Sequence, residues 1–193
     1  MHLLDRRLLF VREHVGFMKL TDVYDLIDPN DGHLVGLARE NVSPLIKTLR
    51  FLVNKSLLPT RIDISEGEGK PALLVLRRNV GFLRKRVDVL DGQGTSLGFM
   101  KSKLFSLGGG FHVFSAAGKP FAEVKGDWKG WNFKLVDLAG RELGTVTKKW
   151  GGLGRELFTS ADNYMVAVTG DLSGNALLLA ASLAIDMVFK ERK

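Results

Sequence analysis

One apolar segment near the C-terminus decides the fold: Asn175-Ala-Leu-Leu-Leu-Ala-Ala-Ser-Leu-Ala-Ile-Asp-Met-Val-Phe189. Asp171 and Ser173 offer N-cap oxygens just before it, so the pattern predicts a helix over about residues 173–190. Its apolar residues cover every face, which means that protein or lipid must surround the helix. At about 1.5 Å per residue the segment spans roughly 22 Å, shorter than the ~30 Å hydrocarbon core of a bilayer. A helix buried in protein is therefore favoured over a membrane anchor.

Strand patterns repeat through the chain before this helix. Five copies of an alternating strand, a turn rich in Asp, Ser and Gly, and a second strand occur at residues 24–36, 61–74, 87–98, 111–122 and 133–144. Each copy is typical of a β-hairpin. With Leu8–Glu13 and Tyr164–Thr169 the strands number about twelve, and a barrel of about eleven or more strands can enclose a helix. We therefore predict one mainly β domain over residues 1–193, a closed antiparallel barrel of about twelve strands, over about residues 8–169, around the C-terminal helix.

A short basic segment interrupts the strand pattern at about residues 43–53. Ser43 as N-cap and Pro44 at the first helical position predict the start of a helix. Apolar side chains then recur at helical spacing, while Lys47 and Arg50 fall off the apolar face. Two interpretations stay open: a lid packed over one end of the barrel, which we favour, and a helix that lies on a membrane surface.

The composition narrows the possible functions. The chain has 193 residues and carries 28 Lys and Arg against 21 Asp and Glu, a net charge of +7 that favours anionic partners. It contains no cysteine, which excludes disulfides, thiolate zinc sites and thiol nucleophiles. The four histidines lack metal-ligand spacing and no hydrolytic or redox motif stands out, so we do not expect an enzyme. The N-terminus lacks the pattern of a signal peptide, which favours a cytoplasmic protein.

The stretch from Lys148 to Tyr164, Lys-Lys-Trp-Gly-Gly-Leu-Gly-Arg-Glu-Leu-Phe-Thr-Ser-Ala-Asp-Asn-Tyr, resembles the signature of the phospholipid scramblase family. As in that family, one strand and an apolar helix follow, and the helix ends in a similar pattern at Ala184–Phe189. The upstream hairpins also look like those of compact scramblase-related proteins, so the resemblance covers nearly the whole chain from about Leu8. It implies the fold shared by scramblases, plant LURP-one-related proteins and the Tubby C-terminal domain, a twelve-stranded barrel around a central helix.

The resemblance implies less about function. Scramblases are described as moving phospholipids between leaflets with calcium, and Tubby-like domains as binding phosphoinositides. Ser160 stands where scramblases place an acidic residue of a calcium-binding segment, which leaves Asp162, Asn163 and Asp171 as candidate calcium ligands. Calcium usually takes six to eight oxygens, so such a site would be weak, and no cofactor is required. A turn at residues 162–163 and a helix cap at Asp171 would explain the same residues and are favoured.

Basic clusters form the candidate working surface, because neighbouring barrel strands could bring them together. The candidate lipid-binding residues are Arg77, Arg78, Arg84, Lys85, Arg86, Lys101 and Lys103. Several cations close to an anionic membrane give useful, salt-sensitive binding, whereas a solvated rim would explain the same residues without a partner. We expect anionic phospholipid headgroups rather than nucleic acid as the partner, at the inner face of the membrane, and no protein partner is indicated. The alternative is a structural or protein-interaction module, or a carrier of an apolar ligand, with no membrane role.

Overall fold

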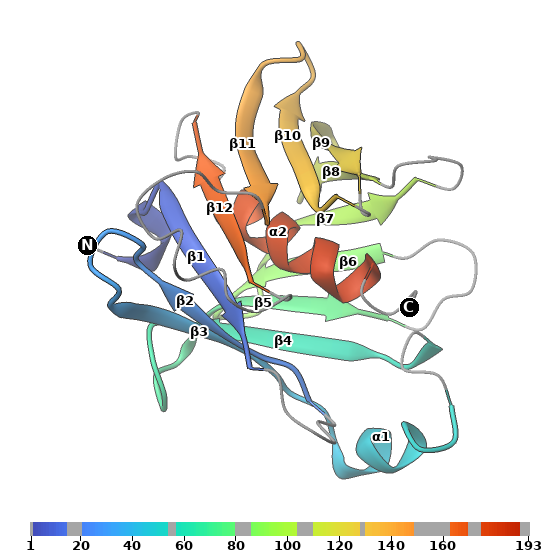
Figure 1. Cartoon of the computed structure of the whole chain (residues 1–193). Coiled ribbons are helices and arrows are strands. Elements are labelled where there is room, and N and C mark those ends of the chain that lie inside the picture. The colour runs from blue at the N-terminus through green and yellow to red at the C-terminus, as the bar shows by residue number, and fades with distance from the viewer. Residues whose placement is uncertain are drawn as a thin grey trace.

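The computed structural model describes residues 2–14, 21–53, 57–79, 86–103, 110–127, 130–148, 163–169 and 175–189, with the backbone alone for Asp127 and residues 186–189. Within them, twelve antiparallel strands form a closed barrel (Figure 1), in which each strand pairs with its neighbours in sequence and β12 pairs with β1. The strands are β1 (Leu8–Glu13), β2 (Val23–Ile27), β3 (Leu34–Glu40), β4 (Thr60–Ser65), β5 (Ala72–Arg78), β6 (Arg86–Asp91), β7 (Ser96–Ser102), β8 (Gly110–Ser115), β9 (Pro120–Asp127), β10 (Asn132–Asp137), β11 (Glu142–Thr147) and β12 (Tyr164–Val168). The predicted fold class is confirmed.

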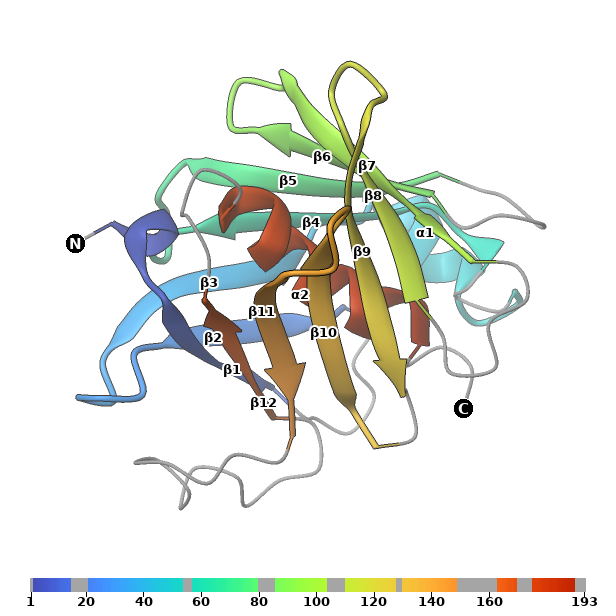
Figure 2. The same ribbon diagram turned by 90° about the horizontal axis from the view of Figure 1, so that it is seen from above.

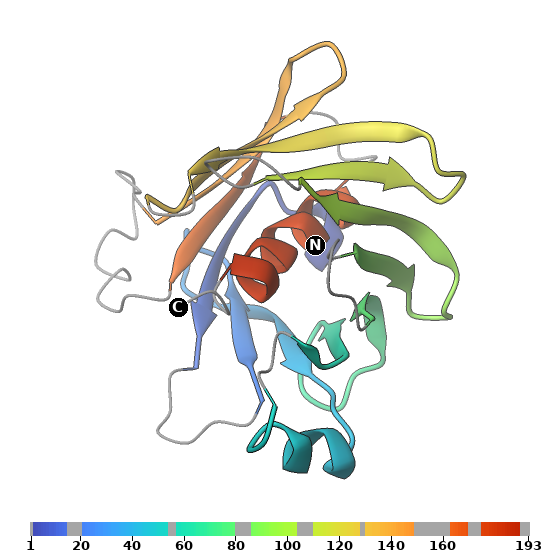
Figure 3. The ribbon, with the colours of Figure 1, turned by 90° about the vertical axis from the view of Figure 1, so that its right-hand side faces the viewer.

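The C-terminal helix α2 (Asn175–Phe189) lies inside this barrel, as Figures 2 and 3 show. Residues 177–185 are all buried, which is the environment that a helix with apolar residues on every face requires. The strands contribute alternate side chains to the same core, among them Val87 and Val89 of β6 and Phe133 and Leu135 of β10. The helix is therefore sheathed by strands. Among the described helices, none has both the length and the apolar character needed to cross a membrane.

Each of the five predicted hairpins is present and is built in the same way. They are β2–β3, β4–β5, β6–β7, β8–β9 and β10–β11. In each, the register shifts close to the turn, at Leu26/Ile27, Ile64/Ser65, Val89/Leu90, Val113/Phe114 and Leu135/Val136. Each turn also holds a glycine with φ between 72° and 86°, at Gly32, Gly69, Gly94, Gly118 and Gly140. Register shifts of this kind are typical of β-bulges, which bend and twist strands and so help a sheet to curl and close.

An element that the sequence patterns did not predict closes one end of the barrel. The 3-10 helix η1 (Leu3–Asp5) places Leu3 in the core, with 1% of its surface exposed. The side-chain amide of Asn175, the first residue of α2, donates hydrogen bonds to the backbone carbonyls of Leu4 and, at 3.1 Å, of Arg6. The N-terminal segment is thus joined to the start of the central helix at one mouth of the barrel.

The short helix α1 (Pro44–Leu49) is briefer than the predicted residues 43–53. It begins as expected, because the Ser43 hydroxyl accepts a hydrogen bond from the Ile46 amide at 3.4 Å. However, α1 has no buried residue and stands beside the barrel wall below β4 rather than across a barrel end (Figures 1 and 3). The lid interpretation is therefore wrong, because a lid would bury its apolar face against the strands.

Candidate functional site

The outer face of the wall formed by β6, β7 and β8 collects part of the predicted basic surface. Arg86 at the start of β6 lies opposite Lys101 of β7, and Lys101 lies opposite His112 of β8. Directly opposite residues in neighbouring antiparallel strands share one face of the sheet. The pairing of β6 with β7 therefore brings together two cations that are 15 positions apart in sequence.

Two phenylalanines form the floor of this surface. Phe99 of β7 and Phe114 of β8 are opposite partners, and their rings stack with centroids 4.8 Å apart and an interplanar angle of 16°. The Arg86 guanidinium carbon lies 3.8 Å from the Phe99 centroid. The Lys101 ammonium lies 5.2 Å from the Phe99 centroid and 5.4 Å from the Phe114 centroid. We call these four residues the cation–aromatic face, since each cation lies within cation–π range of a ring.

Two carboxylates adjoin the cation–aromatic face and limit its charge. Asp88 Oδ1 accepts a hydrogen bond from Arg86 Nε at 2.7 Å. Glu123 of β9 pairs with Lys103, and with Lys125 at 3.0 Å. Burial raises the pKa of the Glu123 carboxyl, but the hydrogen bonds and charges of the two lysines outweigh this and hold the pKa below its usual value. Glu123 is therefore ionised at neutral pH.

The balance of these groups leaves the region cationic. Arg86, Lys101, Lys103 and Lys125 carry four positive charges, and Asp88 and Glu123 carry two negative ones, so about two positive charges remain at neutral pH. This surplus is modest, so the aromatic floor matters as much as the charge for any binding at this face.

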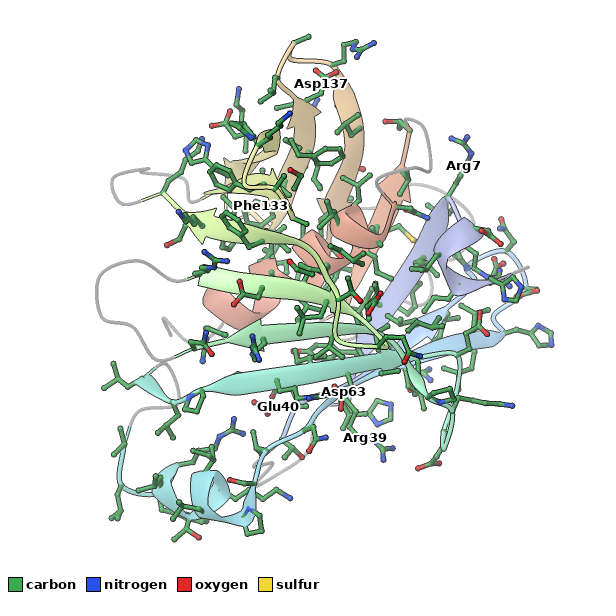
Figure 4. The ribbon with its side chains drawn as sticks, turned by 180° about the vertical axis from the view of Figure 1, so that it is seen from behind. Arg7, Arg39, Glu40, Asp63, Phe133 and Asp137 are labelled. Carbon is green, nitrogen blue, oxygen red and sulfur yellow. The ribbon has the colours of Figure 1, made fainter. Side chains whose placement is uncertain are left out.

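A hollow of about 490 Å³ lies next to the cation–aromatic face, between β8 and β9 and the β10–β11 turn. Its lining includes Phe114, Glu123 and Lys125 from the wall and Asp137 and Leu138 from the turn. Figure 4 shows Asp137 at the tip of the β10–β11 hairpin. Hydrogen bonds from the Arg141 and Ala139 amides support the Asp137 carboxylate, and the first of these is the main reason that its pKa is lowered. The Asp137 carboxylate therefore stabilises the β10–β11 turn.

The structure separates the two neighbouring arginines of β5. Arg77 is exposed and lies opposite Asp88, at the border of the cation–aromatic face. Arg78 points into the barrel, is 1% exposed, and donates hydrogen bonds to the Thr60 hydroxyl at 3.0 Å and the Leu58 carbonyl at 3.4 Å. The prediction that Arg78 belongs to the lipid-binding surface is therefore wrong. Consecutive strand residues point to opposite faces, so Arg77 and Arg78 could not share one surface.

Several predicted site residues fall outside the described part of the chain. Arg84 and Lys85 of the basic cluster are among them, as are Ser160 and two of the candidate calcium ligands, Asp162 and Asp171. The third candidate, Asn163, is 3% exposed just before β12. In the ranges that the structure describes, no group of three His, Asp or Glu side chains is arranged to hold a metal ion. The calcium prediction stays a prediction.

A second hollow, of about 390 Å³, lies between α1, the outer faces of β3 and β4, and the β4–β5 turn. Figure 4 shows Arg39, Glu40 and Asp63 on this side of the barrel. Its charges are mixed and largely paired, with Arg39 bound to Glu68 at 3.0 Å and Asn41 donating to Asp63 at 3.0 Å. The sequence patterns did not indicate this hollow, because its lining comes from α1, β3, β4 and the β4–β5 turn, which meet only in the folded barrel.

Comparison with known proteins agrees with the family resemblance of the Lys148–Tyr164 stretch. The model of the Scramblase family matches residues 71–192, well over half of the chain. A phospholipid scramblase family protein of Schizosaccharomyces pombe is 24% identical over 210 residues, which cover 98% of this chain and 55% of that protein. The chain thus spans about half the length of this relative. No solved structure gives a significant match. The family-model match, which includes β5 to β12 and α2, shows that the chain belongs to the scramblase family.

Proposed function

We propose that this protein binds the surface of membranes that contain anionic phospholipids, through the cation–aromatic face. The observation that carries the proposal is that Arg86 and Lys101 lie over the stacked rings of Phe99 and Phe114 on the outer wall of the barrel. Cations placed near an anionic membrane contribute about 1 kcal/mol each, and phenylalanine rings add the apolar surface that interfacial segments use. Such a face suits the boundary between water and lipid.

Family membership supports the same proposal. The chain belongs to the scramblase family, and a relative that it matches is named as a phospholipid scramblase family protein. The alternative of an apolar ligand carried inside the barrel is less well supported, because α2 occupies the interior and any such ligand would have to displace it. The chemistry of the outer wall therefore carries the argument.

The test is co-sedimentation with phosphatidylcholine vesicles with and without phosphatidylserine. The double variant Arg86→Gln/Lys101→Gln removes two cations at about 1 kcal/mol each, so binding to the anionic vesicles should weaken roughly 30-fold at low salt. The control Arg12→Gln/Arg141→Gln removes the same charge from β1 and the β10–β11 turn, where both arginines are at least half exposed, and should bind like the wild type. Equal losses in both variants, or no binding by the wild type, would reject the proposal.

Movement of phospholipids between leaflets is the second candidate function, favoured by the family match. Dithionite quenching of fluorescent lipids in reconstituted vesicles measures it directly. A larger quenched fraction with protein than without would support scrambling, and an unchanged fraction would reject it. We propose that surface binding itself needs no calcium, so a calcium chelator should leave co-sedimentation unchanged.

A further inference from the structure

The exposed apolar side chains of this protein are concentrated in one place. Of the large hydrophobic residues that the structure describes, six are exposed, and four of these lie in or just after α1. They are Leu45, Phe51, Leu52 and Val53, with 68%, 67%, 81% and 36% of their surfaces exposed. We call these four residues the α1 tip. Single exposed apolar residues are ordinary, but four within nine positions of the chain are a concentration that favours a contact surface.

The α1 tip is held in place by a buried ion pair. Glu40, the last residue of β3, receives hydrogen bonds from both terminal nitrogens of Arg50, one of them at 2.9 Å, and from the Asp22 amide at 3.0 Å. The side chains of Arg50 and Glu40 are only 4% and 0% exposed. A buried ion pair contributes little net stability, but it fixes geometry because either partner alone is costly to bury. Arg50 immediately precedes Phe51, so this anchor presents the α1 tip to solvent.

We propose that the α1 tip inserts into the headgroup and upper acyl region of the bilayer, an inference that rests on the membrane binding proposed above. A bilayer fits this surface because it needs no complementary pocket, whereas four side chains fall far short of the 20–30 residues that each side of a stable protein interface typically supplies. Exposed Lys47 lies within the same helix. Apolar side chains flanked by a cation are typical of segments that lie in the membrane interface.

The position of α1 agrees with the cation–aromatic face. Figure 1 shows α1 on the same side of the barrel, the right in that view, as the start of β6 and the end of β7. These two strand ends carry Arg86 and Lys101.

The α1 tip and the cation–aromatic face should differ in how their membrane binding responds to salt. Salt screens the attraction of exposed cations, but it does not weaken the burial of apolar side chains. Binding through both regions should therefore leave a fraction that survives high salt.

The absence of cysteine from the chain allows a direct test. Leu52→Cys and Leu34→Cys each create a single labelling site, at residues that are 81% and 53% exposed, and Leu34 begins β3 at the end of that strand that lies away from α1 (Figure 1). Each variant is labelled with a polarity-sensitive fluorophore and titrated with phosphatidylcholine vesicles that contain phosphatidylserine. We expect a blue shift and a several-fold rise in emission for the label at position 52 and none for the label at 34.

The outcomes separate this inference from the proposed function. If the labelled proteins co-sediment with the vesicles while the position-52 label stays water-exposed, insertion of the α1 tip is rejected and surface binding stands. If neither protein co-sediments, both proposals fail. A shift at position 52 that appears without vesicles as protein concentration rises would show that a second copy covers the tip, which also rejects the inference.

An unlabelled pair of variants gives an independent readout. Phe51→Ser/Leu52→Ser removes two apolar side chains that contact little of the protein, so the barrel should fold normally while vesicle binding at high salt weakens roughly tenfold or more. Leu34→Ser is the control and should bind like the wild type. High-salt binding that is equal in all three proteins would overturn the inference.

Discussion

The two α-helices that the structure describes are both rich in apolar residues, yet the barrel encloses one and leaves the other outside. Residues 177–185 of α2 are all buried, whereas α1 has no buried residue and the α1 tip is exposed. The difference follows from their patterns. Helix α2 has 15 residues and is apolar on every face, so strands can pack against it on all sides. Helix α1 has six residues and an exposed Lys47, so strands cannot surround it in the same way. Apolar content alone therefore does not say what surrounds a helix.

The largest expected effect comes from placing the same charge in α2 and in the α1 tip. Leu183 of α2 is 1% exposed and Leu52 is 81% exposed. Leu183→Asp should lower the free energy of unfolding by about 5 kcal/mol or more, because a carboxylate would be buried among apolar side chains. Leu52→Asp should change it by less than about 0.5 kcal/mol. Urea unfolding followed by circular dichroism measures both, and equal losses would mean that α2 is not enclosed.

The next prediction concerns the buried ion pair that anchors α1. Glu40→Gln leaves the Arg50 guanidinium buried without its counter-charge and should cost about 3 kcal/mol of unfolding free energy. Glu68→Gln is a matched control, because the pair of Glu68 with Arg39 is exposed and should contribute less than about 1 kcal/mol. Thermal unfolding distinguishes them. Similar, small shifts in both variants would show that Arg50 and Glu40 are not sequestered from water.

A smaller effect is expected where η1 meets the start of α2. Asn175→Ala removes the hydrogen bonds to the Leu4 and Arg6 carbonyls and should cost about 1–2 kcal/mol. The loss should be accompanied by faster hydrogen exchange in residues 3–6 and in the first turn of α2, with the distant hairpins unchanged. Uniformly faster exchange over the whole barrel would instead indicate a global role for this amide.

The smallest predicted effect is the pH dependence of the outer wall. Glu123 has a lowered pKa in the folded protein, so its carboxylate stabilises the fold above its unfolded pKa, and this contribution is lost as the pH falls through the lower folded value. The melting temperature of the wild type should therefore fall toward that of Glu123→Gln between about pH 5 and pH 3. A constant difference between the two proteins across this range would contradict the ion pairs with Lys103 and Lys125.

Most of the fold could be predicted from residue patterns because the signals are local and repeated. Five hairpins with turn glycines, and one helix apolar on every face, leave a closed barrel as the consistent architecture. The position of the 3-10 helix η1 at the mouth of the barrel could not be predicted in this way. It depends on an amide–carbonyl contact between Asn175 and Leu4, which are separated by nearly the whole chain.

The candidate site was less predictable, because it depends on which strands become neighbours. Residues 86, 101 and 103 could be named as part of a basic surface, but the ring stack of Phe99 and Phe114 depends on the β7–β8 register. Arg78 shows a different failure. Consecutive residues of a strand face opposite sides of the sheet, whether they are charged or apolar. With Arg77 on the outer face, Arg78 must therefore point into the barrel.

The central claim is that strands enclose α2 while a membrane covers the α1 tip. Hydrogen exchange with and without phosphatidylserine vesicles tests it in one measurement. Without vesicles, residues 177–185 should exchange slowly and residues 44–53 quickly, and with vesicles only the second segment should gain protection. Fast exchange of residues 177–185 in free protein, followed by protection on adding vesicles, would contradict the account, because it would show that lipid rather than the barrel shelters the central helix.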